Sequence, residues 1–431
     1  MPSFSLNYGL KRAKIFKSKM AEVIPFRAVC YNGKGVPGAD VVAPPYDIIT
    51  PVMRKALYEK SPYNIVRIDA GAEMDGDNEA VNKYTRAKEH LEAWLREGVL
   101  VRTEKPSFYA YAMDYEAGGG QRTVFGFFGL VRLEELGNGI YPHECTHSKP
   151  KADRFTLMSA CAANTSPIFS IYRSPARAAS GVVKKAMEGS PYIVARDFDG
   201  ALHRLWHIGD EASVGEIKED LVGRAIYIAD GHHRYETALY YRDIMREKNP
   251  DAAADEPFNY VLMFLANIED DCLTILPAHR LVSPDGDIIE GIRGHFEIKE
   301  IPPDADITKA ISGSKNTFGL YIGGRQYTLG YKAGEFGDIH PVLRHLDVSV
   351  LHDVVFKRLL GVGDVAYEMN AEAAKNEVDG GKYRAAFFLN PTGVDEVEEV
   401  ALSLLRMPPK STYFYPKVMT GFVINILKNS L

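Results

Sequence analysis

Five consecutive residues, Asp230 to Arg234, carry a carboxylate, two imidazoles and a guanidinium around a single glycine. They follow an apolar run at 226–229 and precede a segment, 235–247, whose pattern predicts a helix. A strand–turn–helix junction of this kind points free backbone N–H groups and the positive end of a helix dipole outward. The pattern therefore predicts a binding site for phosphate or another anion.

Each residue of this turn has a role in that prediction. Gly231 allows close approach of the backbone to a ligand, and Arg234 offers a planar fork of donors for phosphate oxygens. His232 and His233 can donate to phosphate or carry protons near neutral pH, and His233 is also a candidate catalytic residue. Asp230 is a second catalytic candidate, which could orient a histidine, contact a metal-bridged phosphate or only cap the helix. We expect Arg234 to point outward, so that its replacement would remove binding and leave the fold intact.

A second polar cluster, PHECTHSKPKADR, lies between two apolar segments. It supplies His143 and Glu144 as candidate catalytic residues, with Glu144 as a general base, and Lys151 and Arg154 as candidate phosphate ligands. HECTH matches the spacing of the zinc-protease motif, but the flanking prolines leave barely one helical turn and apolar periodicity is missing. We therefore predict an anion-binding or general-base loop without a metal site. The alternative is a solvated charged loop.

Two further basic stretches could complete the site. The proline-bounded segment MPPKSTYFYPK offers Lys410, Ser411 and Lys417 as ligands for phosphate or carboxylate. The segment LPAHR places His279 and Arg280 at a strand end, where they could add a second anion contact. The alternatives are a rigid aromatic-packed connection for the first and a surface strand terminus for the second. The Walker pattern GxxxxGK[ST] is absent from the sequence.

Size and composition limit the possible functions. The 431 residues are enough for two or three domains, and the net charge of −6 argues against bulk binding of nucleic acid. Four widely spaced cysteines without a CxxC pair are typical of reduced thiols in a cytoplasmic protein. The sequence has no apolar run of membrane-spanning length, so we predict a cytoplasmic location and no membrane partner. The basic segment 1–21 is predicted to be a disordered tail or to precede a true start at Met20.

Strands and helices alternate irregularly, which predicts a mixed α/β or α+β fold with two or more domains. After the tail we predict an N-terminal α/β region at 22–175, a central region at 176–345 with the DGHHR turn, and a C-terminal region at 346–431 that packs on the others. Predicted helices lie at 51–60, 77–98, 214–221, 235–247, 348–360 and 394–405. Predicted strands lie at 41–47, 108–115, 123–133, 167–172, 192–198, 203–208, 226–229, 258–267, 273–277, 317–322, 327–331 and 385–389.

Several motifs together resemble the bacterial and archaeal family named domain of unknown function 1015. They are VAPPYDII, PHECTHSKPKADRF, ANTSPIFSIY, YIADGHHRYETAL, LPAHRLV and MPPKSTYFYPKVMTG, and the resemblance runs from about residue 22 to the C-terminus. The turn is also similar to the phosphate-binding turn of the ParB and sulfiredoxin superfamily, which includes free-serine kinases. That similarity implies phosphate contacts for Gly231, His232, His233 and Arg234, with Asp230 in the same pocket. Histidine stands where sulfiredoxins have a reactive cysteine, so sulfinic-acid reduction is not implied.

We therefore predict a phosphoryl-transfer enzyme, a nucleotide-dependent kinase of a small hydroxylated metabolite such as free serine. One alternative is a phosphatase of a phosphorylated metabolite such as phosphoserine, and another is a nucleotide-binding regulatory protein. The predicted ligands are ATP or ADP, with Mg²⁺, and a small phosphorylated molecule. Neither the charge balance nor the sequence pattern indicates a nucleic-acid partner. The oligomeric state stays open.

Overall fold

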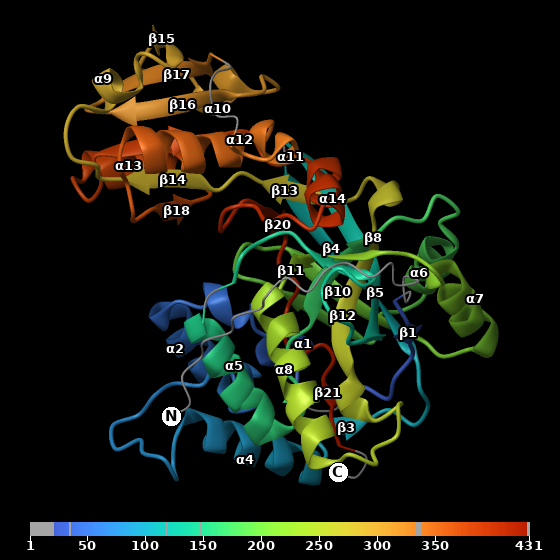
Figure 1. Cartoon of the computed structure of the whole chain (residues 1–431). Helices are drawn as coiled ribbons and strands as arrows, with labels where there is room; N and C mark the ends of the chain where they lie inside the picture. The colour runs from blue at the N-terminus through green and yellow to red at the C-terminus, as the bar shows by residue number, and fades with distance from the viewer. Residues whose placement is uncertain (1–20, 34–35, 118, 147, 333–337, 429–431) are drawn as a thin grey trace. The chain divides into compact units, whose positions relative to one another are not determined.

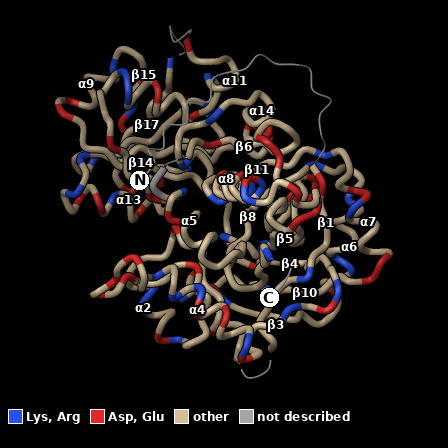
Figure 2. The backbone as a smooth tube through the Cα atoms, turned by 60° about the horizontal axis from the view of Figure 1, so that its bottom comes forward, with Lys and Arg blue, Asp and Glu red and all other residues tan. Residues whose placement is uncertain are grey.

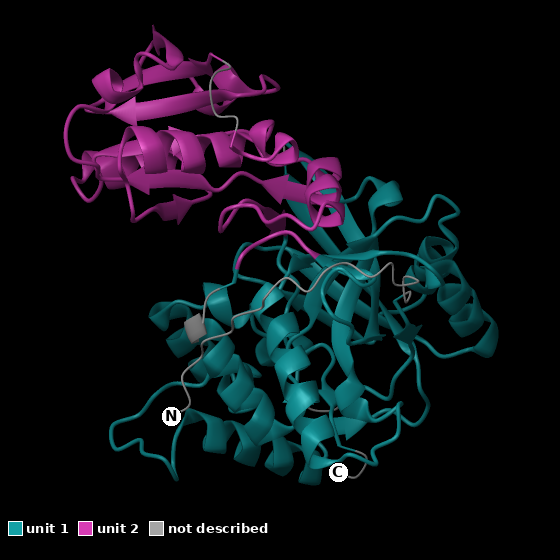
Figure 3. Ribbon diagram, viewed as in Figure 1, with its two compact units in different colours: residues 1–141, 146–273, 416–431 teal, residues 142–145, 274–415 magenta. Residues whose placement is uncertain are grey.

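The computed structural model describes residues 21–33, 36–117, 119–146, 148–332 and 338–428. The chain divides into two compact units, which are coloured separately in Figure 3. Unit 1 consists of Met1–Tyr141, Thr146–Leu273 and Pro416–Leu431, and unit 2 consists of Pro142–Cys145 and Thr274–Tyr415. The chain therefore leaves unit 1 to form unit 2 and returns to unit 1 for its last residues.

The boundaries predicted for the three regions differ from the boundaries of these units. The boundary at 175/176 falls inside unit 1, and that at 345/346 falls inside unit 2. The three-region division stays a prediction about the domains. Residues 1–20 of the predicted tail, and the second histidine of HECTH, His147, lie outside the described residues.

Unit 1 is built on a nine-stranded mixed sheet (Figure 1). Its strands are β1 (Val23–Ile24), β4 (Phe108–Ala117), β5 (Gly120–Arg132), β6 (Ile140–Pro142), β8 (Ile168–Tyr172), β9 (Ile193–Arg196), β10 (Leu202–Ile208), β11 (Ile226–Asp230) and β12 (Tyr260–Asn267). The strand order is β6-β11-β8-β12-β5-β4-β10-β9, with β1 also paired to β5. The parallel pair β8–β12 makes the sheet mixed, since the other pairs of known register are antiparallel.

Helices and short strand pairs surround this sheet. The helices of unit 1 are α1 (Gly38–Val41), α2 (Pro51–Lys60), α3 (Val66–Asp69), α4 (Lys83–Arg96), α5 (Ser148–Cys161), α6 (Ala178–Met187), α7 (Glu211–Leu221) and α8 (His232–Lys248). Single 3-10 turns are η1 (Tyr46–Ile48), η2 (Pro257–Asn259) and η3 (Ile268–Asp270), and two small strand pairs join β2 (Val29–Tyr31) to β3 (Leu100–Arg102) and β7 (Ala163–Asn164) to β21 (Asn425–Ile426). Helix α5 packs against both α4 and α8 (Figure 1).

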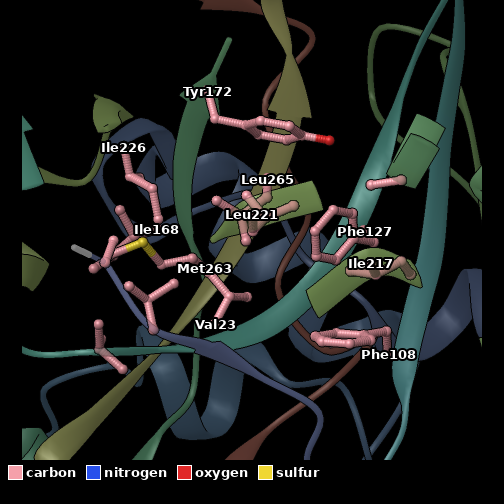
Figure 4. Close-up of a cluster of buried hydrophobic side chains, with 14 of the residues drawn as sticks. Val23, Phe108, Phe127, Ile168, Tyr172, Ile217, Leu221, Ile226, Met263 and Leu265 are labelled. Carbon is pink, nitrogen blue, oxygen red and sulfur yellow. The ribbon is translucent and has the colours of Figure 1, made fainter. Parts of the chain in front are cut away.

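Both faces of the central strand β12 are buried. Met263 and Leu265 belong to a core that also takes residues from α6, α7 and α8 (Figure 4). On the other face, Phe264 contacts the ring of Tyr111, which in turn contacts Phe422 from the C-terminal segment. A strand buried on both faces reads as a continuous apolar run, which is why 258–267 was predictable as a strand.

Unit 2 is built on a separate antiparallel sheet. Its elements are β13 (Thr274–Leu276), β14 (His279–Val282), α9 (Ile288–Ile292), β15 (Phe296–Ile301), α10 (Ile307–Ile311), β16 (Thr317–Ile322), β17 (Arg325–Tyr331), α11 (Pro341–Arg344), α12 (Asp347–Ser349), the π-helix η4 (Val350–Leu359), β18 (Ala366–Glu368), α13 (Ala371–Asp379), β19 (Ala385–Phe388), α14 (Val394–Leu402) and β20 (Tyr413–Tyr415). The strand order is β15-β17-β16-β19-β14-β18, and β13 pairs with β20. Along β19, Phe387 packs with η4 and α14, whereas Phe388 packs with α10 and α13. The two units together confirm a mixed α/β fold.

Several predicted elements differ from the structure, and the helix expected at 77–98 begins only at Lys83. The strand expected at 41–47 is replaced by the end of α1 and by η1, because Pro44 and Pro45 cannot donate to a ladder. The helix expected at 235–247 begins at His232, so both histidines lie in its first turn. The loop expected at 142–154 becomes α5 from Ser148 onward. Pro150 does not end that helix, because a proline in a first turn removes no helical hydrogen bond.

Charged residues of both signs are interspersed along the backbone of the two units (Figure 2). Across the ranges that the structure describes, no helix is long and apolar enough to cross a membrane.

Candidate anion-binding site

The DGHHR turn joins the end of β11 to the start of α8. Gly231 is the N-cap residue, with φ +96° and ψ +28°, a left-handed conformation that glycine adopts without strain. Gly231 has no side chain that could cap the helix, and a capping role for Asp230 stays a prediction. The Asp230 carboxylate accepts a hydrogen bond from Arg234 Nη2 at 3.1 Å and lies 3.6 Å from Lys417 Nζ. Asp230 therefore lies between two cations at the start of α8.

Arg234 is buried, and the expectation that it points outward is wrong. Its exposed fraction is 8%, and its Nη1 donates to the carbonyl oxygen of Pro167. The guanidinium also lies over Gly231, where a Cβ would come within 2.9 Å of Arg234 Nε. The side chain folds back because Asp230, four residues earlier, lies within reach. Arg234 therefore holds the turn against β8, in addition to any contact with a ligand.

Unit 1 also contains a cavity of about 300 Å³. Its walls come from η1, α2, the segment from α3 to α4, and α5. It is lined by Tyr46, Arg54, Ile68, Asp69, Ala70, Gly71, Lys83, Tyr84, Pro150, Asp153, Arg154 and Leu157. The VAPPYDII and KPKADRF motifs therefore meet in one cavity.

Arg154 is the central cation of the cavity wall. Its Nε and Nη2 donate to Asp153 Oδ2 at 2.9 and 2.6 Å, and its Nη1 donates to the Asp69 carbonyl oxygen at 2.8 Å. Its guanidinium carbon lies 4.0 Å from the centre of the Tyr46 ring. Burial alone would lower the pKa of Arg154, but the carboxylates of Asp69 and Asp153 outweigh it and raise that pKa. Arg154 is therefore a fixed positive charge.

Asp153 is held by three donors. Besides Arg154, it accepts from Tyr84 Oη at 2.7 Å and lies 3.0 Å from Lys83 Nζ. Burial opposes ionisation of Asp153, but the charge of Arg154 and these hydrogen bonds lower its pKa to about 2. Asp153 therefore organises the cations of the wall as a permanent anion.

A short segment of unit 1 connects the cavity with the DGHHR turn. Thr165 Oγ1 donates to Asp69 Oδ1 at 2.7 Å, and two residues later Pro167 accepts from Arg234. A second hollow of about 30 Å³ is lined by both Arg154 and Arg234. Burial raises the pKa of Tyr46, and the charges of Arg234, Arg154 and Asp230 act on it too. The cavity and the turn therefore form one site, which we call the unit 1 site.

Other predicted residues also lie in unit 1. His232 is buried and His233 half-buried in the first turn of α8. Lys151, on α5, contacts Glu236 Oε2 of α8 at 2.9 Å, and Thr146 Oγ1 donates to the same oxygen at 2.8 Å. Lys151 thus ties two helices together, and its role as a phosphate ligand stays a prediction.

The predicted residues His143 and Glu144 belong to unit 2. His143 Nε2 lies 2.8 Å from Thr412 Oγ1, and Glu144 Oε1 accepts from the Thr412 N–H and hydroxyl, both at 3.2 Å. In the neighbouring loop, Ser411 Oγ donates to the Pro408 carbonyl oxygen at 2.7 Å, and Lys410 is exposed. These contacts hold the loop before β20, and the catalytic and phosphate roles of these residues stay predictions.

His279 and Arg280 lie on β14 of unit 2 and are 2% and 0% exposed, so a surface strand terminus is excluded. Arg280 donates to the Ala278 and Lys410 carbonyl oxygens and to His352 Nε2. Burial lowers the pKa of Arg280 to about 10. Burial, followed by the charge of Arg280, lowers the pKa of His279 to about 4 and that of His352 to about 3. The hydrogen bonds of the Arg280 guanidinium are therefore made to other groups of the protein.

Sequence reasoning missed several residues of the unit 1 site. Tyr46 had a signal, the rigid Pro-Pro-Tyr-Asp turn, and Asp153 stood inside a motif that was recognised for its cations. Asp69 follows the segment Ile65-Val66-Arg67-Ile68, which is apolar except for Arg67, and a buried carboxylate is unusual there. Arg54 had no signal. Within the described ranges, no group of three His, Cys, Asp or Glu side chains is placed to hold a metal ion.

Comparisons with known proteins give a family and weak structural likenesses. No curated protein sequence matches the chain. A free serine kinase mutant in complex with AMP is similar at 13% identity, with a TM-score of 0.35, over 67% of this chain and 87% of that chain. SbnI with a C-terminal truncation, from Staphylococcus aureus, is similar at 12% identity, with a TM-score of 0.36, over 70% and 90%. A conserved hypothetical protein from Pyrococcus furiosus is similar at 14% identity, with a TM-score of 0.35, over 69% and 95%.

The match to a protein family is stronger than these structural likenesses. Residues 23–349 match the family described as "Protein of unknown function (DUF1015)". This range includes the VAPPYDII, KPKADRF, ANTSP, DGHHR and LPAHR motifs, whereas the resemblance over MPPKSTYFYPK stays a prediction. The match extends over more than half of the sequence, and the protein is therefore a member of the DUF1015 family.

Proposed function

We propose that the protein transfers a phosphoryl group from a nucleotide to a small hydroxylated metabolite, as a nucleotide-dependent kinase. The observation that supports this is the meeting of four motifs around the unit 1 site: VAPPYDII, KPKADRF, ANTSP and DGHHR. Phosphoryl transfer depends on positioning and charge neutralisation more than on covalent chemistry of the protein. Fixed cations beside the N-terminus of a helix supply both.

The DGHHR turn is the proposed binding site of the nucleotide phosphates. The first N–H groups of α8 would hold the phosphate oxygens, with His233 and Lys417 close to them. Arg234 keeps the turn in place through Pro167 and Asp230. The donor is a nucleoside di- or triphosphate, ADP or ATP.

A nucleotide brings Mg²⁺ with it, and the ion neutralises phosphate charge when bound. Asp230 is the carboxylate of the turn, but Arg234 and Lys417 already contact its two oxygens. This arrangement suits an anchor of the turn better than a metal ligand. We therefore assign Asp230 to positioning and derive no step through the metal.

The proposal is tested with the purified full-length chain in thermal-shift and turnover measurements. ATP, ADP, L-serine, O-phosphoserine and phosphate are supplied with and without Mg²⁺. A ligand that binds only the folded protein raises its melting temperature. We expect a shift with a nucleotide, and a phosphorylated product only when nucleotide and acceptor are both present.

Other outcomes would replace the kinase proposal. Release of phosphate from O-phosphoserine without nucleotide would make the protein a phosphatase, and a nucleotide shift without turnover would make it a regulator. Absence of any shift and any turnover would contradict the unit 1 site as a phosphate site. Lys417→Met should weaken the nucleotide shift, whereas Lys428→Met, an exposed lysine in the same segment, is the matched control.

A further inference from the structure

We propose that the cavity of about 300 Å³ in unit 1 binds the phosphoryl acceptor, and that this acceptor is a small carboxylic acid with a hydroxyl group. In this assignment Arg54 binds the carboxylate and Asp69 accepts the hydroxyl proton. The inference rests on the proposed function, which it extends to a substrate class and a catalytic base. Neither residue belongs to a motif that the sequence singled out.

Among the residues that the structure describes, Arg54 is the cation of the cavity that has no anionic partner. It extends from α2 and is half-buried, and within the described residues its Nε is buried without a hydrogen-bond partner. Lys83 and Arg154, the other two cations of the wall, both contact Asp153. The wall therefore has three cations against two carboxylates, Asp69 and Asp153. A half-buried guanidinium in this position favours a ligand with one negative group, which it can bind through two parallel hydrogen bonds.

Asp69 offers the complementary polar contact. It is 2% exposed, and its Oδ1 accepts from Thr165 and lies 3.4 Å from Arg154 Nη1. Its Oδ2 is buried and has no hydrogen-bond partner in the part of the chain that the structure describes. Buried carboxylate oxygens are almost always hydrogen-bonded, so we expect the unpaired Oδ2 of Asp69 to accept a hydrogen bond from a ligand. A hydroxyl group is such a donor.

The two carboxylates of the wall have different tasks. Three donors hold Asp153, and its pKa of about 2 makes it a poor acceptor of a proton. Asp69 keeps one oxygen for the ligand. During transfer, the hydroxyl oxygen forms a bond to the terminal phosphorus of the nucleotide, and its proton passes to Asp69 Oδ2. The bond between that phosphorus and the bridging oxygen breaks, and the shortened nucleotide leaves with the electron pair.

The size of the cavity agrees with a small acceptor. About 300 Å³ is at the lower end of the range for ligand pockets and suits a molecule of a few carbons. The separate hollow of about 30 Å³ shares the lining residues Arg154 and Leu157 with this cavity and is also lined by Arg234 of the DGHHR turn. Acceptor and phosphoryl donor would thus enter neighbouring parts of the unit 1 site.

Binding is tested first, by calorimetry on the full-length chain. The probes are L-serine, D-glycerate and L-lactate, with ethanolamine lacking the carboxylate and propanoate lacking the hydroxyl group. We expect saturable binding of at least one of the three hydroxy acids and none of the two analogues. Arg54→Met should weaken that binding about 10- to 100-fold, as expected for loss of a charge-assisted contact. Lys55→Met, which removes the exposed neighbouring charge on α2, should leave it unchanged.

Turnover tests the role of Asp69. Asp69→Asn keeps the shape of the side chain and should lower kcat about 10²- to 10⁴-fold while the nucleotide-induced thermal shift stays as in the wild type. Asp75→Asn, an exposed carboxylate, is the control. Arg54→Lys, which keeps the charge and loses the fork, should restore part of the acid binding that Arg54→Met removes.

The inference and the proposed function can fail separately. Acid binding that depends on Arg54 in a protein that binds no nucleotide would keep the ligand class and reject the kinase. Nucleotide binding with no saturable acid binding, or with Arg54→Met behaving as Lys55→Met, would reject the inference and keep the kinase. Wild-type kcat in Asp69→Asn would overturn the role of Asp69 as the base.

Discussion

Arg154 of unit 1 and Arg280 of unit 2 are both buried arginines with opposite surroundings. Arg154 is 7% exposed, lines a cavity and contacts the carboxylates of Asp69 and Asp153. Arg280 is 0% exposed and donates to two carbonyl oxygens and a histidine. The pKa of the first is raised and that of the second is lowered to about 10, although both are buried.

The comparison separates an arginine of a binding site from an arginine of a core. A buried cation that has anionic partners and also lines a cavity can bind a ligand. A buried cation among neutral acceptors links backbone segments and raises the electrostatic cost of any further positive charge nearby. Both arginines stand in motifs that sequence reasoning treated alike, so the partners of a residue decide its role.

The largest expected effect is a difference in stability between two matched substitutions. Arg154→Met leaves the buried Asp69 and the half-buried Asp153 without the cation that both contact, and should lower the free energy of unfolding by about 3–5 kcal/mol. Arg280→Met leaves only neutral acceptors without a donor, and should lower it by about 1–3 kcal/mol. Urea unfolding followed by circular dichroism measures both variants. Equal losses would end the distinction between the two arginines.

A second test concerns the glycine under Arg234. Gly231→Ala places a Cβ on a residue with a φ of +96° and within 3.0 Å of the Arg234 guanidinium. Backbone strain and displacement of Arg234 should together lower the free energy of unfolding by about 2–4 kcal/mol. Gly286→Ala in unit 2 has a φ of +78° and open space, and should lower stability by about 1–2 kcal/mol from strain alone. The melting temperatures of the two variants measure the difference between these losses of stability. A loss at Gly231 no larger than at Gly286 would mean that Arg234 does not depend on this close approach.

The third prediction uses pH. The pKa of His279 is lowered to about 4, whereas in the unfolded chain the histidine takes up a proton near pH 6.5. Between these values the unfolded state binds more protons, so stability falls as the pH falls from about 6.5 toward 4, by about 2 kcal/mol at pH 5. Asp153, with a pKa of about 2, contributes stability above pH 3.8 that is lost only as the pH falls through 2.

Calorimetric scans at pH 7 and pH 5 measure this difference. His279→Phe keeps an aromatic ring packed against Phe388 and removes the titration, so it should reduce the loss of stability between the two pH values. His345→Asn, at an exposed histidine of unit 2, should keep the wild-type loss. An unchanged pH dependence in His279→Phe would remove His279 as its source.

The smallest expected effect compares two threonine hydroxyls. Thr165→Val removes a donor to a carboxylate of Asp69 and should lower the free energy of unfolding by about 1.5–3 kcal/mol. Thr392→Val removes a donor to the Ser411 carbonyl oxygen in unit 2 and should lower it by about 0.5–1.5 kcal/mol. Thermal unfolding of both variants under the same conditions measures the two losses of stability. A larger loss at Thr392 would contradict the charged character of the unit 1 contact.

Much of the fold was predictable because its signals are local. Helix α2 and strand β16 have the predicted limits, 51–60 and 317–322. The cap Thr50 and Pro51 mark the start of α2, and the turn Gly323-Gly324 follows the apolar run of β16. The first turn of α5 was misjudged because Pro150 was taken as a helix stop, although its position in the helix decides its effect.

The site was predictable only where a motif marks it. DGHHR was found from its own residues, and Lys417 from a basic stretch, and the two meet at Asp230. Asp69 and Arg154 are 85 residues apart, and no spacing rule connects residues at that distance. Among the described residues, the Nε of Arg54 has no hydrogen-bond partner, so no pairing could have indicated it. The tertiary fold, not local pattern, brings such residues to the cavity.

The return of the chain to unit 1 sets the order in which the molecule can be completed during synthesis. Lys417 reaches Asp230, Thr420 pairs with Ala43 and Ile424 with Val29, all from the last segment. A nascent chain that has emerged only as far as Tyr415 already contains all of unit 2, but unit 1 still lacks these contacts. Because domains fold as units while they leave the ribosome, unit 2 can form first. The unit 1 site then matures only after the segment from Pro416 onward has emerged.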